Sequence, residues 1–203
     1  DLDRHPIKKA LLSFNENSII FGVKGYTTGQ AATCLLAEDM IEDNAELMIA
    51  SADYEQRYNP ELWQEIIENQ EIDGAIWTYR SASKLLKNPE KFAYCQVEKD
   101  GISVSRIVEK QTISDDPNFD PLVVGTFWYR RASDFKLAVK NLIDNDIRIN
   151  DEHYVGTSIN YLIEEGKKFV IFDINQWISF GDPFELQILE YWQEFFQKEN
   201  SYE

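Results

Sequence analysis

Two positions in the first third of the chain combine residue types suited to a phosphorylated ligand and its metal ion. Gly29 stands directly before small and apolar residues at helical spacing, and Asp53 follows the apolar run Leu47–Ala50. Glycine lets a ligand approach the backbone, and the free N–H groups at a helix start attract anions. A carboxylate beyond the next strand suits a hard cation. The pair indicates a nucleotide site, although α/β domains without a ligand show the same pattern.

The elements around these positions are predicted to be a strand, a helix and a second strand. Ser18–Val23 has the composition of the first strand. We expect Thr27 or Thr28 to cap the helix Ala31–Ile41. Leu47–Ser51 is apolar enough for a strand that is buried on both faces. Ligands of open α/β sheets bind beyond the C-terminal ends of the strands, and the acidic residue lies there.

Strands and helices continue to alternate up to residue 79. A helix is predicted over Pro60–Gln70, followed by a turn at Asp73-Gly74 and a strand over Ala75–Tyr79. This alternation predicts a parallel sheet with right-handed crossovers. Asp1–Phe14 has the pattern of a helix, without the strand and ligand loop that usually open an α/β domain. We therefore expect the chain to be a piece of a longer protein.

The second half predicts a mixed sheet. Phe92–Glu98 and Ile102–Glu109 flank an Asp-Gly turn and are expected to form a hairpin. The further expected strands are Leu122–Arg130, Phe169–Asp173 and Trp177–Phe180, and the further helices are Asp134–Asn145 (capped by Ser133), Glu152–Glu164 and one that opens at Pro183. Together these elements predict one α/β domain over residues 1–203, with a mixed, mainly parallel sheet flanked by helices.

The final predicted helix carries two apolar stripes. We expect the first stripe to point inward, and the second to form either more core packing or an interface in a homo-oligomer. The first stripe is Leu186, Leu189, Trp192 and Phe196, and the second is Ile188, Tyr191 and Phe195.

Composition excludes several classes of partner. The formal net charge of −16 argues against nucleic acid and anionic membranes, which need clustered Lys and Arg. No apolar run approaches the length of a membrane span and no signal peptide opens the sequence, so a cytoplasmic location is expected. Cys34 and Cys95, like His5 and His153, make no metal or triad pattern. We expect Cys34 to be a reduced core residue and both histidines to be structural.

Six segments follow one another along the chain in an order and spacing that are together fairly specific: Thr28–Ala32, Ile49–Asp53, Val108–Lys110, Val124–Tyr129, Ile147–Val155 and Gly181–Leu186. These segments resemble those of the sugar-phosphate nucleotidylyltransferases, and most closely the bacterial branch associated with capsule and surface polysaccharide. The resemblance covers nearly the whole chain and implies a Rossmann-like nucleotide-diphospho-sugar transferase fold that lacks its N-terminal part.

The resemblance implies a role for each matched position. Asp53 would hold Mg²⁺ against the α-phosphate of a nucleoside triphosphate. Lys110 would supply positive charge to a sugar 1-phosphate, Glu109 would accept hydrogen bonds from its hydroxyls, and Gly125 would let the sugar lie on the backbone. The nucleobase would lie against Gly29, Gln30 and Ala31. The sugar-phosphate oxygen would displace pyrophosphate, a reaction that depends on positioning and charge neutralisation.

Three departures from the family pattern bear on activity. The Gly-rich loop with its Arg and the later Pro-Lys are missing, so we expect little or no transferase activity from these 203 residues. Ser179 stands where many relatives carry a second metal-binding Asp, and Asp182 is the nearby substitute. Ala93 replaces a glycine that touches the sugar in some relatives, so the sugar cannot be carried over.

Two other classes remain open. A glycosyltransferase of the related nucleotide-sugar fold usually carries an Asp-x-Asp, whereas this chain has Ser51-Ala52-Asp53. A non-catalytic regulatory or assembly relative fits the serine at position 179 and the missing loop. Replacing Asp53 separates the classes, because only an enzyme loses Mg²⁺-dependent turnover.

Overall fold

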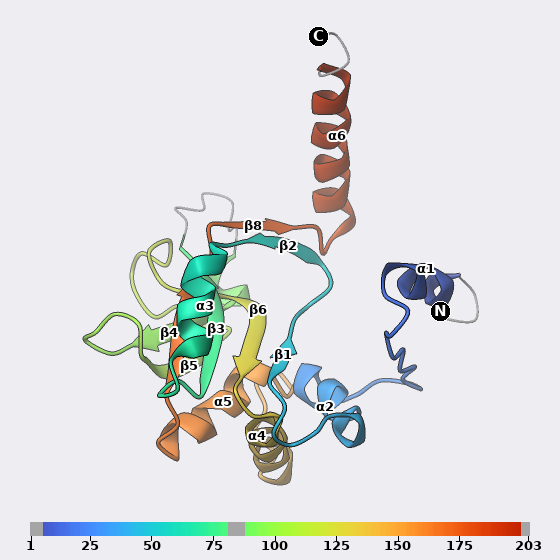
Figure 1. Cartoon of the computed structure of the whole chain (residues 1–203). Coiled ribbons are helices and arrows are strands. Elements are labelled where there is room, and N and C mark those ends of the chain that lie inside the picture. Colours follow the sequence, from blue (N-terminus) through green and yellow to red (C-terminus); the bar gives the residue numbers. More distant parts are fainter. Residues whose placement is uncertain (1–5, 81–87, 200–203) are drawn as a thin grey trace.

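The computed structural model describes residues 6–80 and 88–199 and contains a mixed six-stranded sheet (Figure 1). The strand order is β5-β4-β6-β3-β7, and β1 lies beside the other end of β6. The strands are β1 (Leu47–Ile49), β3 (Gly74–Tyr79), β4 (Ala93–Val97), β5 (Val104–Glu109), β6 (Leu122–Tyr129) and β7 (Phe169–Asp173). A separate two-stranded sheet pairs β2 (Tyr54–Arg57) with β8 (Gln176–Ser179).

Helices cover both faces of the large sheet. On one face α3 (Pro60–Glu68) packs Trp63 and Ile66 against buried strand residues. On the other face lie α2 (Gln30–Leu35), α4 (Ala132–Asp144) and α5 (Val155–Glu164), which share the main apolar core with the strands. The fold class is therefore confirmed as an α/β domain with a mixed sheet flanked by helices. Two further helices, α1 (Ile7–Phe14) and α6 (Pro183–Glu199), and 3₁₀ turns at Glu38–Met40 and Pro89–Lys91 complete the described elements.

The local sequence explains why the core elements form. Asn59 accepts a hydrogen bond from the Glu61 N–H, and Pro60 occupies the first turn of α3, so that helix has a well-defined start. Seven of the eight residues of β6 are buried, as expected for a central strand. The predicted hairpin of β4 and β5 is confirmed, with Ala93 opposite Glu109.

Pairing in the first half differs from the predicted parallel sheet. β1 and β3 run in the same direction, but β6 lies between them and is antiparallel to both. The described parallel pair is β3 with β7. The prediction that β1 is buried on both faces is wrong, since Met48 is 47% exposed. Among the described residues β1 pairs only with β6, so its other edge is open.

Several predicted boundaries and caps are wrong. Ser18–Val23 forms no regular strand, because no described strand pairs with it. The helix predicted over Ala31–Ile41 is the short α2 followed by a 3₁₀ turn, and Gly29 rather than Thr27 or Thr28 occupies its N-cap position. The N-cap residue of α4 is Arg131 and not Ser133. α5 begins at Val155, and α1 begins after Pro6 and buries none of its residues. The predicted helix residues 1–5, with His5, lie outside the described residues.

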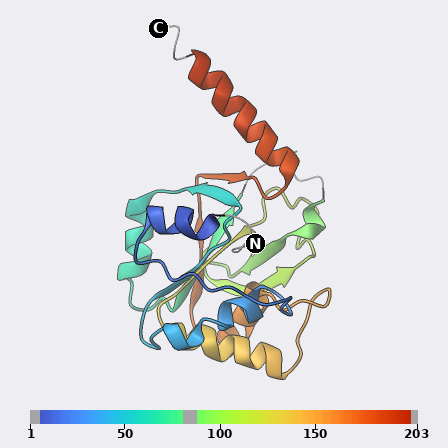
Figure 2. The ribbon, with the colours of Figure 1, turned by 90° about the vertical axis from the view of Figure 1, so that its right-hand side faces the viewer.

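The predicted inward stripe of the last helix is also wrong. Figures 1 and 2 both show α6 projecting away from the rest of the domain. Trp192 is 49% exposed and Phe196 is 55% exposed, and the aromatic rings of this helix contact one another instead of the core. None of the helices in the described part of the chain is both long and apolar enough to span a membrane.

Candidate functional site

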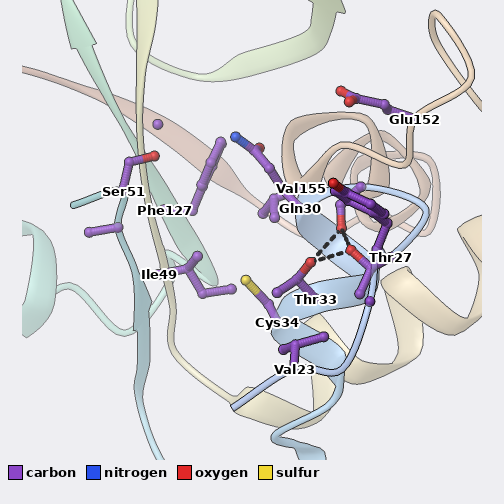
Figure 3. A pocket seen from close by; sticks show the side chains of 15 residues that line it. Val23, Thr27, Gln30, Thr33, Cys34, Ile49, Ser51, Phe127, Glu152 and Val155 are labelled. Carbon is purple, nitrogen blue, oxygen red and sulfur yellow. Dashed lines mark hydrogen bonds between the residues drawn. The ribbon is translucent and has the colours of Figure 1, made fainter. Parts of the chain in front are cut away.

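A cleft of about 520 Å³ opens where the N-terminal end of α2 faces the C-terminal end of β1 (Figure 3). Its walls come from the segment before α2, from β1, from β6 and from the residues just before α5. The lining residues are Val23, Gly25, Tyr26, Thr27, Gly29, Gln30, Thr33, Cys34, Ile49, Ala50, Ser51, Gly125, Phe127, Glu152 and Val155. Sequence positions that are far apart, including the predicted Gly29, Gln30 and Gly125, therefore meet at one cleft.

The three residues predicted to lie against a nucleobase have different positions. Gly29 and Gln30 line the cleft, and Figure 3 labels Gln30 among the side chains drawn there. Ala31 is fully buried, and its N–H donates to the His153 carbonyl at 3.0 Å. Gly29 has φ +133°, and a Cβ there would lie 2.6 Å from the His153 N and O atoms. A glycine is required here by the protein's own backbone, whatever ligand the cleft holds.

Gly125 provides close contact between β6 and the residues that follow β1. Its φ is +85°, and a Cβ there would lie 2.7 Å from the Tyr54 hydroxyl and 3.2 Å from Ser51 Oγ. The Ser51 N–H donates to the same hydroxyl at 3.2 Å. Only the fold brings Tyr54 and Ser51 to Gly125: the sequence predicted no role for Tyr54, and Ser51 lay in the matched segment Ile49–Asp53 without a predicted contact.

Replacing Gly125 by alanine is expected to destabilise the protein by about 2–4 kcal/mol. The left-handed backbone costs an alanine about 1–2 kcal/mol, and displacing the Tyr54 hydroxyl adds to it. Gly25→Ala is the matched control, since Gly25 has the same φ of +85° with nothing within 4 Å of its Cβ position. Urea unfolding of both variants measures the difference, and equal losses would contradict the role of close packing.

Asp53 packs against the turn that links β8 to α6, and Asp182 is the last residue of that turn. Asp53 is exposed, its carbonyl accepts from the Phe180 N–H at 3.0 Å, and a Cβ on Gly181 would lie 2.8 Å from Asp53 Oδ2. Asp182 Oδ1 accepts from the N–H groups of Phe184 and Glu185 at 2.8 and 2.9 Å, which caps α6. The glycine thus leaves space beside the Asp53 carboxylate.

The carboxylates of Asp53 and Asp182 suit Mg²⁺ better than a metal whose ligands must all be protein side chains. Among residues 6–80 and 88–199 no group of three or more His, Cys, Asp or Glu side chains is placed to hold a metal. Magnesium usually binds one or two carboxylates, with water and phosphate oxygens completing its shell. The Ser179 hydroxyl donates to Glu185 Oε2 at 2.7 Å.

Glu109 and Lys110 end β5 next to the first turn of α5. A Cβ on Gly156 would lie 2.5 Å from Glu109 Oε1, and burial raises the pKa of Glu109 to about 7, with Lys110 opposing that shift. Lys110 has a left-handed backbone, donates from Nζ to the Lys91 carbonyl and lies 5.2 Å from the centroid of the Tyr154 ring. Neither residue is among those that line the cleft; they lie beside Gly156 and Tyr154, the two neighbours of the cleft residue Val155.

The charge of the cleft limits what it can bind without help. Glu152 is the charged side chain among its lining residues, which include no Lys or Arg. Cys34 packs against the core, as expected, and also lines the cleft; burial raises its pKa, so the thiol stays protonated at neutral pH. A sugar or a nucleobase fits this lining, whereas a triphosphate needs cations from elsewhere.

Solved structures with the same arrangement of elements identify the fold. The nucleoside-diphosphate-sugar pyrophosphorylase of Vibrio cholerae RC9 matches with a TM-score of 0.69 and 18% identity, over 89% of this chain and 72% of that one. The chain has the sugar-phosphate nucleotidyltransferase fold. The expected resemblance is thereby confirmed at the level of the fold.

Two further nucleotidyltransferase structures give the same result. A glucose-1-phosphate thymidylyltransferase of Bacillus anthracis matches with a TM-score of 0.63 and 17% identity, over 88% of this chain and 69% of that one. The inositol-1-phosphate CTP transferase of T. maritima has a TM-score of 0.64 and 14% identity, over 89% and 67%. No protein-family model and no curated protein sequence matches the chain.

Proposed function

We propose that the 203 residues are part of an enzyme that transfers a nucleoside monophosphate from a nucleoside triphosphate to a sugar 1-phosphate. The supporting observation is one cleft that Gly29, Gln30 and Gly125 line together. The end of β1 also lines this cleft, and Asp53 follows β1 in the chain. The fold neighbours named above are enzymes of this general kind. The product would be a nucleotide-sugar for surface polysaccharide, made in the cytoplasm.

In the proposed reaction an oxygen of the sugar phosphate forms a bond to the α-phosphorus while the bond from that phosphorus to the bridging oxygen breaks. Pyrophosphate leaves with that electron pair. Gly29 and Gln30 would bind the base, and Gly125 and Glu109 the sugar. Lys110 would orient the sugar phosphate. Asp53 would hold Mg²⁺, which would supply charge neutralisation at the α-phosphate.

The cations for the triphosphate must come from a segment other than those that line the cleft. We propose that this segment adds a strand to the open edge of β1. The reason is that the C-terminal end of β1 and the two residues after it, Ile49, Ala50 and Ser51, line the cleft.

The 203-residue chain by itself is expected to release pyrophosphate at the background rate. The test is a coupled pyrophosphate assay with ATP, CTP, GTP, UTP and dTTP against a panel of sugar 1-phosphates and Mg²⁺. A longer form that also carries a strand, a glycine-rich loop with an Arg and a Pro-Lys is expected to turn over with one pair. Failure of every pair with that longer form would refute the proposed transfer reaction.

One observation favours a non-catalytic relative as the second candidate. The Ser179 hydroxyl is engaged by Glu185, and Asp182 caps α6, so the usual second metal carboxylate is either absent or already occupied. A regulatory relative would bind a nucleotide or a partner without turnover in any form. The longer form in the same assay distinguishes the two candidates.

A further inference from the structure

We propose that His153 is a positioning residue that joins the Thr28–Ala31 wall of the cleft to the segment before α5. From the sequence this histidine was expected to have only a structural role, within the segment Ile147–Val155 that resembles the family. In the structure the His153 side chain is only 2% exposed, and its neighbours Glu152 and Val155 line the cleft.

Three hydrogen bonds connect this one residue to the Thr28–Ala31 segment. The His153 N–H donates to the Thr28 carbonyl at 2.7 Å, and the His153 carbonyl accepts from the Ala31 N–H at 3.0 Å. The ring nitrogen Nδ1 lies 2.8 Å from Thr28 Oγ1. Because both main-chain and side-chain atoms take part, the two segments are held in a single relative position.

Gly29 completes this connection. With φ at +133° and both His153 backbone atoms 2.6 Å from its Cβ position, no other residue type permits such close approach of the two segments. Gly29 and Gln30 line the cleft, as do Glu152 and Val155, and Figure 3 shows Gln30 and Val155 together, across from Ile49 and Ser51. The contact between His153 and the Thr28–Ala31 segment therefore holds together the wall that faces β1.

The turn that precedes His153 is closed by its own backbone hydrogen bonds. Ile149 and Glu152 exchange two backbone hydrogen bonds of 3.0 Å around a turn in which Asn150 and Asp151 have left-handed backbones. Burial, and then the charge of Arg148, lower the pKa of His153, and Asp146 at 3.8 Å from Nε2 acts in the opposite direction. The ring is accordingly neutral at pH 7, and its bond to Thr28 is made without a charge.

The test compares Thr28→Val, which removes the hydroxyl at nearly constant shape, with Thr28→Ser, which retains it. The first readout is NMR hydrogen exchange of the Ala31 amide, with the Ile76 amide of the buried strand β3 as the internal reference. We expect Thr28→Val to raise Ala31 exchange roughly tenfold while Ile76 exchange is unchanged, and Thr28→Ser to restore the wild-type rate.

The second readout is the affinity for nucleoside 5′-monophosphates of the five common bases, by NMR titration of the 203-residue chain; it rests on the proposed function. Thr28→Val is expected to lower the affinity for the best-bound nucleotide roughly fivefold. Thr28→Ser keeps the hydroxyl, and the amide of His153→Asn can replace Nδ1, so both of these variants should retain most of the wild-type affinity. Unchanged Ala31 exchange in Thr28→Val would overturn the proposal. Increased exchange in a protein that binds none of the nucleotides would support the connection and refute the proposed nucleotide site.

Discussion

Replacing Asp53 by asparagine is expected to lower Mg²⁺-dependent turnover at least about a hundredfold in a longer form that also carries the strand, the glycine-rich loop with an Arg and the Pro-Lys. The change keeps the size of the side chain and removes the charge that attracts the cation. Since Asp53 is exposed and makes its described main-chain contact through its carbonyl, the loss should come without unfolding. Pyrophosphate release at several Mg²⁺ concentrations measures it.

The 203-residue chain offers a separate test of the metal site. Mn²⁺, added with a nucleoside triphosphate, should broaden the NMR signal of the Gly181 amide, because Gly181 lies against the Asp53 carboxylate. Asp53→Asn is expected to abolish that broadening. Equal broadening in the variant would show that the metal is held elsewhere.

Asp182→Asn is the matched control for this experiment. Asparagine caps helices about as well as aspartate does, so the bonds to the Phe184 and Glu185 N–H groups can be retained. If Asp182 acts as a cap, the variant keeps its metal affinity and its stability. A loss of metal affinity comparable with that of Asp53→Asn would instead make Asp182 the second ligand.

The second large effect concerns Glu109, for which the pH dependence of stability and of binding should have opposite signs. Burial raises its pKa from the usual 4.5 to about 7. Between these values the folded protein retains a proton that the unfolded chain has released, so the free energy of unfolding falls as pH rises. The contribution is about 2 kcal/mol over that window, after allowing for solvent screening.

Glu109→Gln isolates this contribution, because glutamine resembles the protonated acid and does not titrate. Urea titrations at pH 4.5 and 7.5 give the free energy of unfolding of both proteins. From the lower to the higher pH, that of the wild type is expected to fall by about 2 kcal/mol relative to that of the variant. A difference that is independent of pH would contradict the raised pKa.

Binding of a sugar 1-phosphate should respond in the opposite direction. The ionised carboxylate accepts stronger hydrogen bonds from sugar hydroxyls than the neutral acid does. Affinity in the longer form is therefore expected to increase as pH rises through 7, and Glu109→Gln should remove this increase. Calorimetric titration at three pH values tests it with the same protein preparations.

The local sequence pattern was sufficient to predict two kinds of element. These are strands that pair with the next strand in the sequence, and helices whose apolar residues recur at helical spacing. The hairpin of β4 and β5 follows from its Asp-Gly turn, and α3 from Asn59, Pro60 and its apolar face. The grouping of Gly29, Gln30 and Gly125 at one cleft agrees with the resemblance of their motifs to a family. The roles proposed for Asp53, Glu109 and Lys110 stay predictions.

Long-range contacts decided the remainder. Ser18–Val23 has strand composition but no strand beside it, and α6 has an apolar stripe but no surface of the domain to cover it. Propensity specifies what a segment can form, whereas burial and pairing need a second segment at the right distance. This is why sequence periodicity alone placed these two segments wrongly.

The sequence by itself determined the class of the fold, the order of most elements and the positions where glycine and carboxylate suit a phosphorylated sugar and its metal. Only the tertiary structure decided which residues meet there. Tyr54 reaches Gly125 and His153 reaches Gly29 across 71 and 124 positions of the chain. Such contacts carry no local signal, because they arise when the packed sheet and helices bring separate loops to one edge.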